Sequence, residues 1–295
     1  MQNPCLLPPV ATFSIIGFDP ATQTWGIAVQ SKFLAVGALV PWAKAGVGAI
    51  ATQSWANTAY GPQGLALLEE GLHPAEVVER LTQDDEHRDL RQFAVMDRHG
   101  NTAAYTGKRC FQWAGHVNGQ NFSCQGNILV SEATVTAMAE SFQHSAGSLA
   151  ERLLRALRAA QEAGGDSRGK QSAALYVVRE GAGYGGYNDR YIDLRVDDHP
   201  DPIAELERLY GLHQLYFGKP DNAIALDLTG DVRAQVREAL RALGFLGTGG
   251  EDRTLPEALN RFVQMENLEE RWRGEEAIDI EVFRYLKDRA ERAGR

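Results

Sequence analysis

In the first two thirds of the chain, hydrophobic residues form blocks of short strand-like runs, and pairs of helix-like segments separate these blocks. Runs rich in β-branched and aromatic residues that end at turn signals such as Asp19-Pro20 predict strands. Apolar residues at helical spacing predict helices. The predicted strands are 12–18, 25–31, 34–42, 46–53, 91–96, 102–106, 172–178 and 190–196, with further strand-like pieces up to residue 127, and the predicted helices are 65–71, 74–81, 132–143, 148–163 and 200–217.

The order of these segments predicts the fold class. Strands, a helix pair, strands, a second helix pair, strands and a last helix follow one another. Such a block order favours an α+β layered fold over a doubly wound parallel sheet. We therefore expect two stacked antiparallel sheets with helices on both outer faces.

The last quarter of the chain has a different pattern. Residues 218–222, Gly-Lys-Pro-Asp-Asn, are typical of a linker, and the apolar residues beyond them keep helical spacing. Thr254 and Glu257 have the spacing of a capping box. We expect an N-terminal extension at 1–11, a main domain at 12–218 and a small helical domain at 219–295.

Composition narrows the possible partners. The net charge is -9, which does not attract a phosphate backbone or an anionic membrane, so we expect neither nucleic acid nor membrane as a partner. No apolar run approaches the roughly 18 residues of a membrane span. The N-terminus also lacks the basic start of a secretion signal. These features predict a cytoplasmic protein.

Cysteine and histidine usage indicates neither a disulfide framework nor a metal centre. Cys5, Cys110 and Cys124 show no CxxC spacing, and the seven histidines are scattered. We expect free thiols in a reducing compartment, no metal and no cofactor.

Thr12 is the first candidate for chemistry, because it begins the first predicted strand, two residues before Ser14. A hydroxyl at a strand start is most often structural, since threonine favours strands and bonds to main-chain groups. A threonine with a free amino group, however, can use that amine as the base for its own hydroxyl. Both readings stay open from the residues alone.

Lys44 is the single charge in the apolar run 40–51. It either extends to the surface or, if buried, lowers the pKa of a neighbouring group. Asp166 lies in the glycine-containing loop 164–172, which is typical of a solvated loop or of a substrate-binding nest.

Polar clusters end two of the buried strands. Gln53, Ser54 and Asn57 belong to the first, and Asn127 belongs to a weaker one at 125–127. Such clusters form turns with paired side chains, or they line a site in which main-chain N–H groups hold an oxyanion.

Five stretches, in order along nearly all of residues 12–218, are similar to one known family: TFSIIGFDP, WGIAVQSKFLAVGALVPWAKAGVGAIATQSWAN, YGPQGL, GGDSRGKQSAAL and GYGGYNDRYIDLRVDDHPDPIAEL. They resemble the DUF1028 family, which is placed in the Ntn-hydrolase superfamily. This resemblance implies an αββα four-layer sandwich. Residues 223–295 resemble the small peptidoglycan-binding-like helical domain often attached to this family, which implies peptidoglycan or a protein as its partner.

The resemblance also implies roles. Thr12 takes the place of the N-terminal nucleophile, Lys44 that of the active-site lysine and Asp166 that of the supporting acid. Residues 30–32 lie where such proteins have an acidic residue near the nucleophile, although Gln30 is not acidic. The expected substrate-binding residues are Ser14, Ser31, Gln53, Ser54, Asn57 and Asn127.

Together these observations predict an Ntn-type amide-bond hydrolase that acts on a small molecule or peptide, forms a homo-oligomer and needs no cofactor. Eleven residues precede Thr12, so its nitrogen is an amide and not an amine unless they are removed. The alternative is a non-catalytic ligand-binding or assembly protein on the same scaffold.

Overall fold

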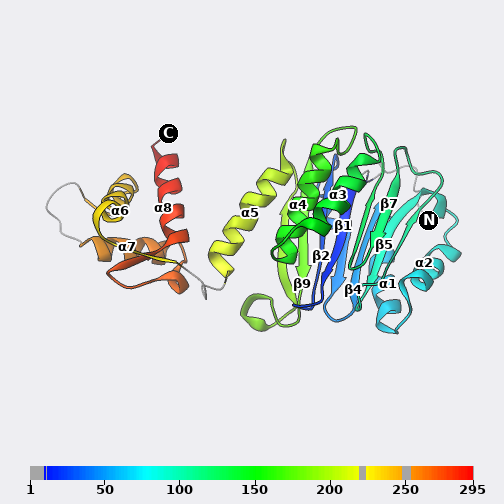
Figure 1. Cartoon of the computed structure of the whole chain (residues 1–295), viewed down its shortest axis with the longest axis horizontal. Helices are drawn as coiled ribbons and strands as arrows, with labels where there is room; N and C mark the ends of the chain where they lie inside the picture. The colour runs from blue at the N-terminus through cyan, green and yellow to red at the C-terminus, as the bar shows by residue number, and fades with distance from the viewer. Residues whose placement is uncertain (1–9, 11, 219–223, 248–253, 295) are drawn as a thin grey trace. The chain divides into compact units, whose positions relative to one another are not determined.

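The computed structural model describes residues 10, 12–218, 224–247 and 254–294 (Figure 1). The chain divides into two compact units, with the boundary between Leu209 and Tyr210. Helix α5 (Pro202–Phe217) runs across this boundary, which lies within it rather than at residues 218–222. Each unit is described by itself below.

Two antiparallel sheets form the first unit in its described residues. The larger has the strand order β10-β9-β2-β1-β8-β7, and the smaller has the order β3-β4-β5-β6. The strands are β1 (Thr12–Asp19), β2 (Thr24–Ser31), β3 (Pro41–Lys44), β4 (Gly48–Ser54), β5 (Arg91–Asp97), β6 (Thr102–Thr106), β7 (Gly115–Gly119), β8 (Phe122–Gly126), β9 (Ser172–Val178) and β10 (Arg190–Val196).

Helices cover the outer face of each sheet (Figure 1). The four helices are α1 (Tyr60–Glu69), α2 (Pro74–Gln83), α3 (Ala133–His144) and α4 (Leu149–Glu162). The first two lie on the smaller sheet, and α3 and α4 lie on the larger. The predicted α+β fold is therefore confirmed, with its layers in the order αββα.

Side-chain alternation along the central strand β1 separates these layers. A Cβ at Gly17 would meet Phe142 of α3 and Leu149 of α4, so Gly17 faces the helices. Ile16, one residue earlier, faces the other sheet instead and belongs to the buried cluster of the inter-sheet layer. Thr12 and Ser14 share the face of Ile16, because residues two apart point to the same side.

The predicted strand 34–42 is wrong over most of its length. Ala35 has a positive φ of 52°, and residues Val36–Ala38 form a 3-10 helix. A left-handed residue interrupts an extended strand, so β3 begins only at Pro41. Further 3-10 turns in the described residues are Arg88–Leu90, Tyr184–Gly186 and Glu269–Arg271.

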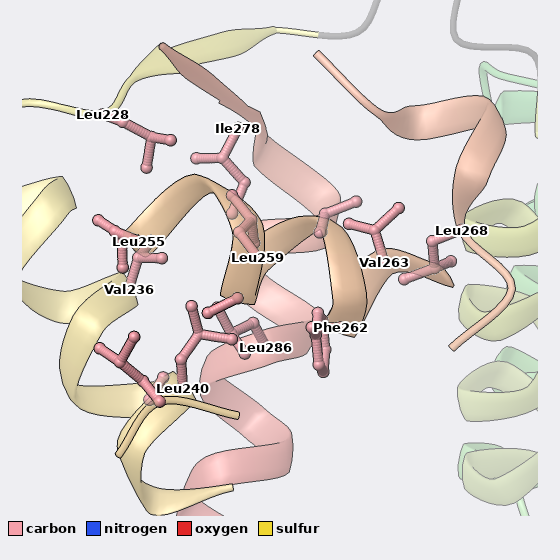
Figure 2. Close-up of a cluster of buried hydrophobic side chains, with 14 of the residues drawn as sticks. Leu228, Val236, Leu240, Leu255, Leu259, Phe262, Val263, Leu268, Ile278 and Leu286 are labelled. Carbon is pink, nitrogen blue, oxygen red and sulfur yellow. The ribbon is translucent and has the colours of Figure 1, made fainter. Parts of the chain in front are cut away.

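The second unit, from residue 210 onward, has its own hydrophobic core (Figure 2). Helices α6 (Gly230–Ala242), α7 (Leu255–Met265) and α8 (Ile280–Ala293) contribute Leu240, Leu259, Phe262 and Leu286 to it. The predicted capping box of α7 is present, since the Glu257 amide donates to Thr254 Oγ1 and the Thr254 amide donates to Glu257.

This unit also contains a small antiparallel ladder that the helical pattern does not predict. Its strands are β11 (Ala225–Asp227) and β12 (Ala277–Asp279). Three residues are too few to establish an alternating pattern, which explains why the sequence does not reveal them. Arg271 is buried beside the ladder, where it pairs with Asp279 and donates to the Leu215 and Gln214 carbonyl groups of α5.

Candidate functional site

A cluster of buried polar side chains fills one end of the layer between the two sheets. Its members come from β1, β4, β5, β8 and the residue after β8, and none of them is exposed to solvent. They are Thr12, Ser14, Gln53, Gln92, Gln125 and Asn127, and we call them the inter-sheet polar cluster. Farther along the strands this layer holds a cluster of buried hydrophobic residues, among them Ile16, Trp25 and Met96.

Ser14 is held firmly by two glutamines. Gln125 Nε2 donates to Ser14 Oγ at 2.7 Å, and Ser14 Oγ donates to Gln53 Oε1 at 2.6 Å. These bonds fix the direction of the Ser14 proton toward an amide oxygen, which is a weak base. Ser14 is therefore a fixed part of the cluster, and no base in this arrangement activates it as a nucleophile.

Gln92 of β5 joins the two sheets. Its Oε1 accepts from Gln53 Nε2 at 2.8 Å and from Asn127 Nδ2 at 2.9 Å. Its Nε2 donates to the Gly126 carbonyl of β8 at 2.7 Å. The side chain thus saturates donors and acceptors from both sheets, as a buried polar network requires.

Thr12 is the least satisfied member of the cluster. Its carbonyl accepts from the Asn127 amide at 3.0 Å and lies 3.4 Å from Gln53 Nε2. Its Oγ1, however, has no hydrogen-bond partner within the described residues, and neither has Asn127 Oδ1. A buried hydroxyl and a buried amide oxygen are thus left with unused bonding capacity where β1 begins.

Ser31 is the neighbour of Thr12 across the sheet. The two residues are paired in the β1–β2 register, so their side chains point to the same face. Gln30 pairs with Phe13 instead and faces the helix layer. Within the stretch 30–32 that was expected near Thr12, Ser31 is therefore the residue beside it and Gln30 is not, because one step along a strand reverses the face.

Asp166 lies near the same end of the larger sheet. Its carboxylate accepts from the Lys32 amide at 3.1 Å, directly after Ser31, and pairs with the Arg168 guanidinium at 2.9 Å. Leu129, two residues after Asn127, forms a bridge with Asp166. The acid is buried, and it connects the end of β2 to the segment that follows β8.

Lys44, to which the resemblance gives the place of the active-site lysine, lies away from Thr12 and Ser14. Its Nζ pairs with Glu69 at 2.5 Å, and half of the side chain is exposed. In the β3–β4 register Lys44 is opposite Gly48, five residues from Gln53 and so about 16 Å along the strand. A short edge strand lets the amine reach water, which avoids the cost of burying a charge.

Two other expected residues, Ser54 and Asn57, lie outside the cluster. The Ser54 main chain pairs with Val10, whose amide donates to the Ser54 carbonyl at 2.6 Å. Asn57 accepts from the Ala59 amide through Oδ1, close to the start of α1. Neither side chain belongs to the hydrogen-bond network around Thr12.

Sequence reasoning assigned no role to Gln92 and only a weak one to the stretch that contains Gln125. The available signal is a glutamine next to apolar residues inside a strand, as in RQFAVMD for Gln92 and FSCQG for Gln125. Such a residue needs a buried partner, because an unpaired amide costs free energy in the core. Two of these glutamines in separate strands would have indicated a shared network.

The cysteines and other metal-binding side chains show no shared site. Burial raises the pKa of both the Cys110 and the Cys124 thiol, and each is a free cysteine. Cys5 lies outside the described residues. Across the described part of the chain, no group of three or more His, Cys, Asp or Glu side chains could hold a metal ion.

Each unit is similar to a known family. The model of the "Family of unknown function (DUF1028)" matches residues 12–206, and that of the "Putative peptidoglycan binding domain" matches residues 216–286. No curated protein matches the chain. Within the residues described, no helix is long and apolar enough to cross a membrane.

A solved structure extends the comparison to the fold. A DUF1028 protein from Silicibacter pomeroyi, known from a crystal structure, is 35% identical, with a TM-score of 0.63. The match covers 69% of this chain and 89% of that one. With two thirds of its length matched by the family model and this structural likeness in addition, the chain belongs to the DUF1028 family.

Proposed function

We propose that this protein is an amide-bond hydrolase of the N-terminal-nucleophile type, acting on a small molecule or peptide, and that Thr12 is its nucleophile. One observation supports this more than any other. Thr12 is the first residue of the central strand, and its buried Oγ1 has no hydrogen-bond partner among the described residues. A hydroxyl on a rigid strand that the fold does not use is suited to attack a substrate carbonyl once a base is present.

The proposed nucleophile is latent while Ala11 is attached. A peptide nitrogen is delocalised and cannot accept the hydroxyl proton. Once the bond between Ala11 and Thr12 is hydrolysed, the new α-amine takes that proton and Thr12 Oγ1 attacks the substrate carbonyl. The α-ammonium then gives the proton to the substrate nitrogen, the C–N bond breaks, and an ester to Thr12 forms as the amine leaves. Water then hydrolyses the ester and restores the hydroxyl.

Val10 supports the idea of a latent form. It is buried, and its main chain pairs with Ser54 at the end of β4, so the residue two before Thr12 is attached to the smaller sheet. Removal of this segment would expose the Ser54 amide and carbonyl, which bond to Val10, at the end of β4. We propose that these groups and the Asn127 side chain orient the substrate. We also propose that Asp166, which accepts from the Lys32 amide, fixes the end of β2, where Ser31 lies.

The second candidate is a non-catalytic ligand-binding or assembly protein. It is favoured by the chemistry of the cluster, whose hydrogen bonds in the described residues join amides, hydroxyls and main-chain groups. The expected lysine is absent from this set, since Lys44 pairs with Glu69. Such a neutral network binds uncharged polar ligands without helping to ionise a hydroxyl.

One experiment separates the two candidates. The intact chain and a chain that begins at Thr12 would be compared on a panel of aminoacyl and peptidyl amides that release a coloured amine. Hydrolase function predicts a rate increase of roughly 10²–10⁴-fold for the trimmed chain, which Thr12→Ala abolishes. Equal rates for the intact and trimmed chains would reject Thr12 as an N-terminal nucleophile. Binding without turnover by both chains would support the second candidate.

For the C-terminal unit we propose peptidoglycan as the ligand, on the basis of its family match. The full chain would be sedimented with purified peptidoglycan and, in parallel, with cellulose as an insoluble control. Retention on peptidoglycan alone supports the assignment. Equal retention on both, or on neither, contradicts it and leaves a protein partner as the alternative.

A further inference from the structure

A pocket opens between α1 and α2, on the outer side of the smaller sheet. Its volume is about 530 Å³, within the range of about 300–1,000 Å³ that is usual for small-molecule sites. It lies on the face of the sheet opposite to Thr12. Its polar lining includes Arg80, Asp84 and Asp85, and its apolar lining includes Ala66, Leu67 and Leu81.

Part of the pocket wall is already neutralised. Tyr60 Oη donates to Asp85 Oδ2 at 2.6 Å, and Arg91 Nε donates to the same oxygen at 2.8 Å. Burial by itself would raise the pKa of Asp85, but the hydrogen bonds from Arg91, Tyr60 and the His87 amide lower it to about 2. The carboxylate is thus ionised and paired, and it offers no free charge to a ligand.

Two other charges in the wall are not used by the fold. Arg80 and Asp84 are exposed, one turn apart on α2, and among the described residues neither side chain forms an ion pair or a hydrogen bond. An arginine four residues before an aspartate is the weaker order for a helical ion pair. Asp84 is also the C-cap of α2, where the helix dipole disfavours a carboxylate.

The spacing of Arg80 and Asp84 indicates which charged groups a ligand of this pocket carries. Four residues at about 1.5 Å rise place Arg80 and Asp84 about 6 Å apart along the helix, so both reach one small molecule. Arg80 suits a carboxylate. Asp84 suits an ammonium group, whose positive charge would offset the unfavourable interaction between the Asp84 carboxylate and the helix dipole. Leu67, Leu81 and Ala66 provide an apolar surface between α1 and α2.

We propose that this pocket binds a free α-amino acid with an aliphatic side chain. The carboxylate pairs with Arg80, the ammonium pairs with Asp84, and the side chain contacts Leu67 and Leu81. Asn57 and Gln63 also line the pocket, and in this proposal their amide groups bond to the polar end of the ligand. This site is separate from the inter-sheet polar cluster, and the proposal does not depend on hydrolysis at Thr12.

The test is a titration of the full intact chain with L-leucine, followed by calorimetry and by amide chemical shifts. We expect a dissociation constant on the order of 0.1–1 mM, as for a ligand of nine heavy atoms with two ion pairs. N-acetyl-leucine amide lacks both charges and should bind at least about tenfold more weakly. Isoamylamine and 4-methylpentanoate, with one charge each, should be intermediate.

Variants of exposed residues locate the site without threatening the fold. Arg80→Gln and Asp84→Asn should each weaken leucine binding about ten- to a hundredfold, because each removes a charge-assisted contact. Arg98→Gln and Glu79→Gln are matched controls outside the pocket lining and should leave binding unchanged. Ala66→Trp, which fills the pocket, should abolish binding.

Three outcomes would overturn the proposal: no binding of leucine at about 10 mM, equal binding of leucine and its uncharged analogue, or unchanged binding in both Arg80→Gln and Asp84→Asn. Because binding to the intact chain is measured, the result does not depend on activation of Thr12.

Discussion

The two ends of the inter-sheet layer are built from the same strands yet stabilised in different ways. At the apolar end, Ile16, Trp25 and Met96 are buried through contact area, which tolerates small errors in position. At the polar end, Ser14, Gln53 and Gln92 depend on hydrogen bonds that require defined partners. At the polar end, a buried atom that lacks a hydrogen-bond partner marks a group that the fold does not use. Thr12 Oγ1 is such an atom within the described residues.

The largest effect is expected at the apolar end, from Trp25→Ala. Trp25 is fully buried, stacks on Phe18 with ring centroids 4.7 Å apart and donates to the Asp97 carbonyl. Its loss should lower the free energy of unfolding by about 3–5 kcal/mol. Urea denaturation with an unchanged slope would measure this value. A loss below about 1 kcal/mol would contradict the view that contact area stabilises this end.

Gln92→Leu should be the next most damaging change. It removes the hydrogen bonds of Gln92 to the Gln53 and Asn127 side chains and to the Gly126 carbonyl in a buried layer. A loss of about 2–4 kcal/mol in unfolding free energy follows from the removal of several buried hydrogen bonds. Gln63→Leu, at an exposed position, is the control and should change stability by less than about 0.5 kcal/mol. Similar values for both variants would mean that the network contributes little.

The free energy of unfolding should fall at acid pH through the Tyr60–Asp85–Arg91 group. The inter-sheet polar cluster should not contribute, because it consists of neutral amides and hydroxyls. The pKa of Asp85 is lowered to about 2 in the folded chain, against about 3.9 when unfolded. Its stabilisation is therefore complete above about pH 4 and is lost as the pH falls toward 2, with a size on the order of 2 kcal/mol.

The Asp85 contribution can be isolated with two variants. Asp85→Asn should be less stable at neutral pH and should show a shallower loss of stability between about pH 4 and pH 2. Asp84→Asn, whose carboxylate has no partner in the described structure, should follow the parent curve. Parallel curves for the parent and Asp85→Asn would assign the acid dependence to other carboxylates.

The smallest effect is expected at Thr12 itself. Thr12→Val removes a hydroxyl that has no partner within the described residues, so unfolding free energy should stay the same or rise by up to about 1 kcal/mol. A residue that adds nothing to stability and yet is polar and buried is a stronger candidate for function. A loss above about 1 kcal/mol would show that the hydroxyl has a partner in solution, such as a bound water.

Several features of this protein follow from local sequence alone. The block order of strands and helix pairs predicted the layered α+β fold, and Thr254 with Glu257 predicted a helix start that the structure contains. The pattern of TFSIIGFDP placed Thr12 at the start of a strand, where β1 begins. These features depend on neighbouring residues, whose influence on the backbone is nearly independent of the rest of the fold.

Other features were decided by the tertiary structure. Strands β1 and β2 are buried on both faces, so they lack the polar-apolar alternation that would have shown Gln30 facing the helices and Ser31 facing Thr12. Strand register placed Gln125 beside Ser14, 111 residues away in the chain, and only the packing of the two sheets brought Gln53 to Ser14. Lys44 stands in an apolar run like a buried residue, but its place on a short edge strand gave its charge access to water. Burial of a side chain depends on what packs against it from distant parts of the chain, and no local pattern contains that information.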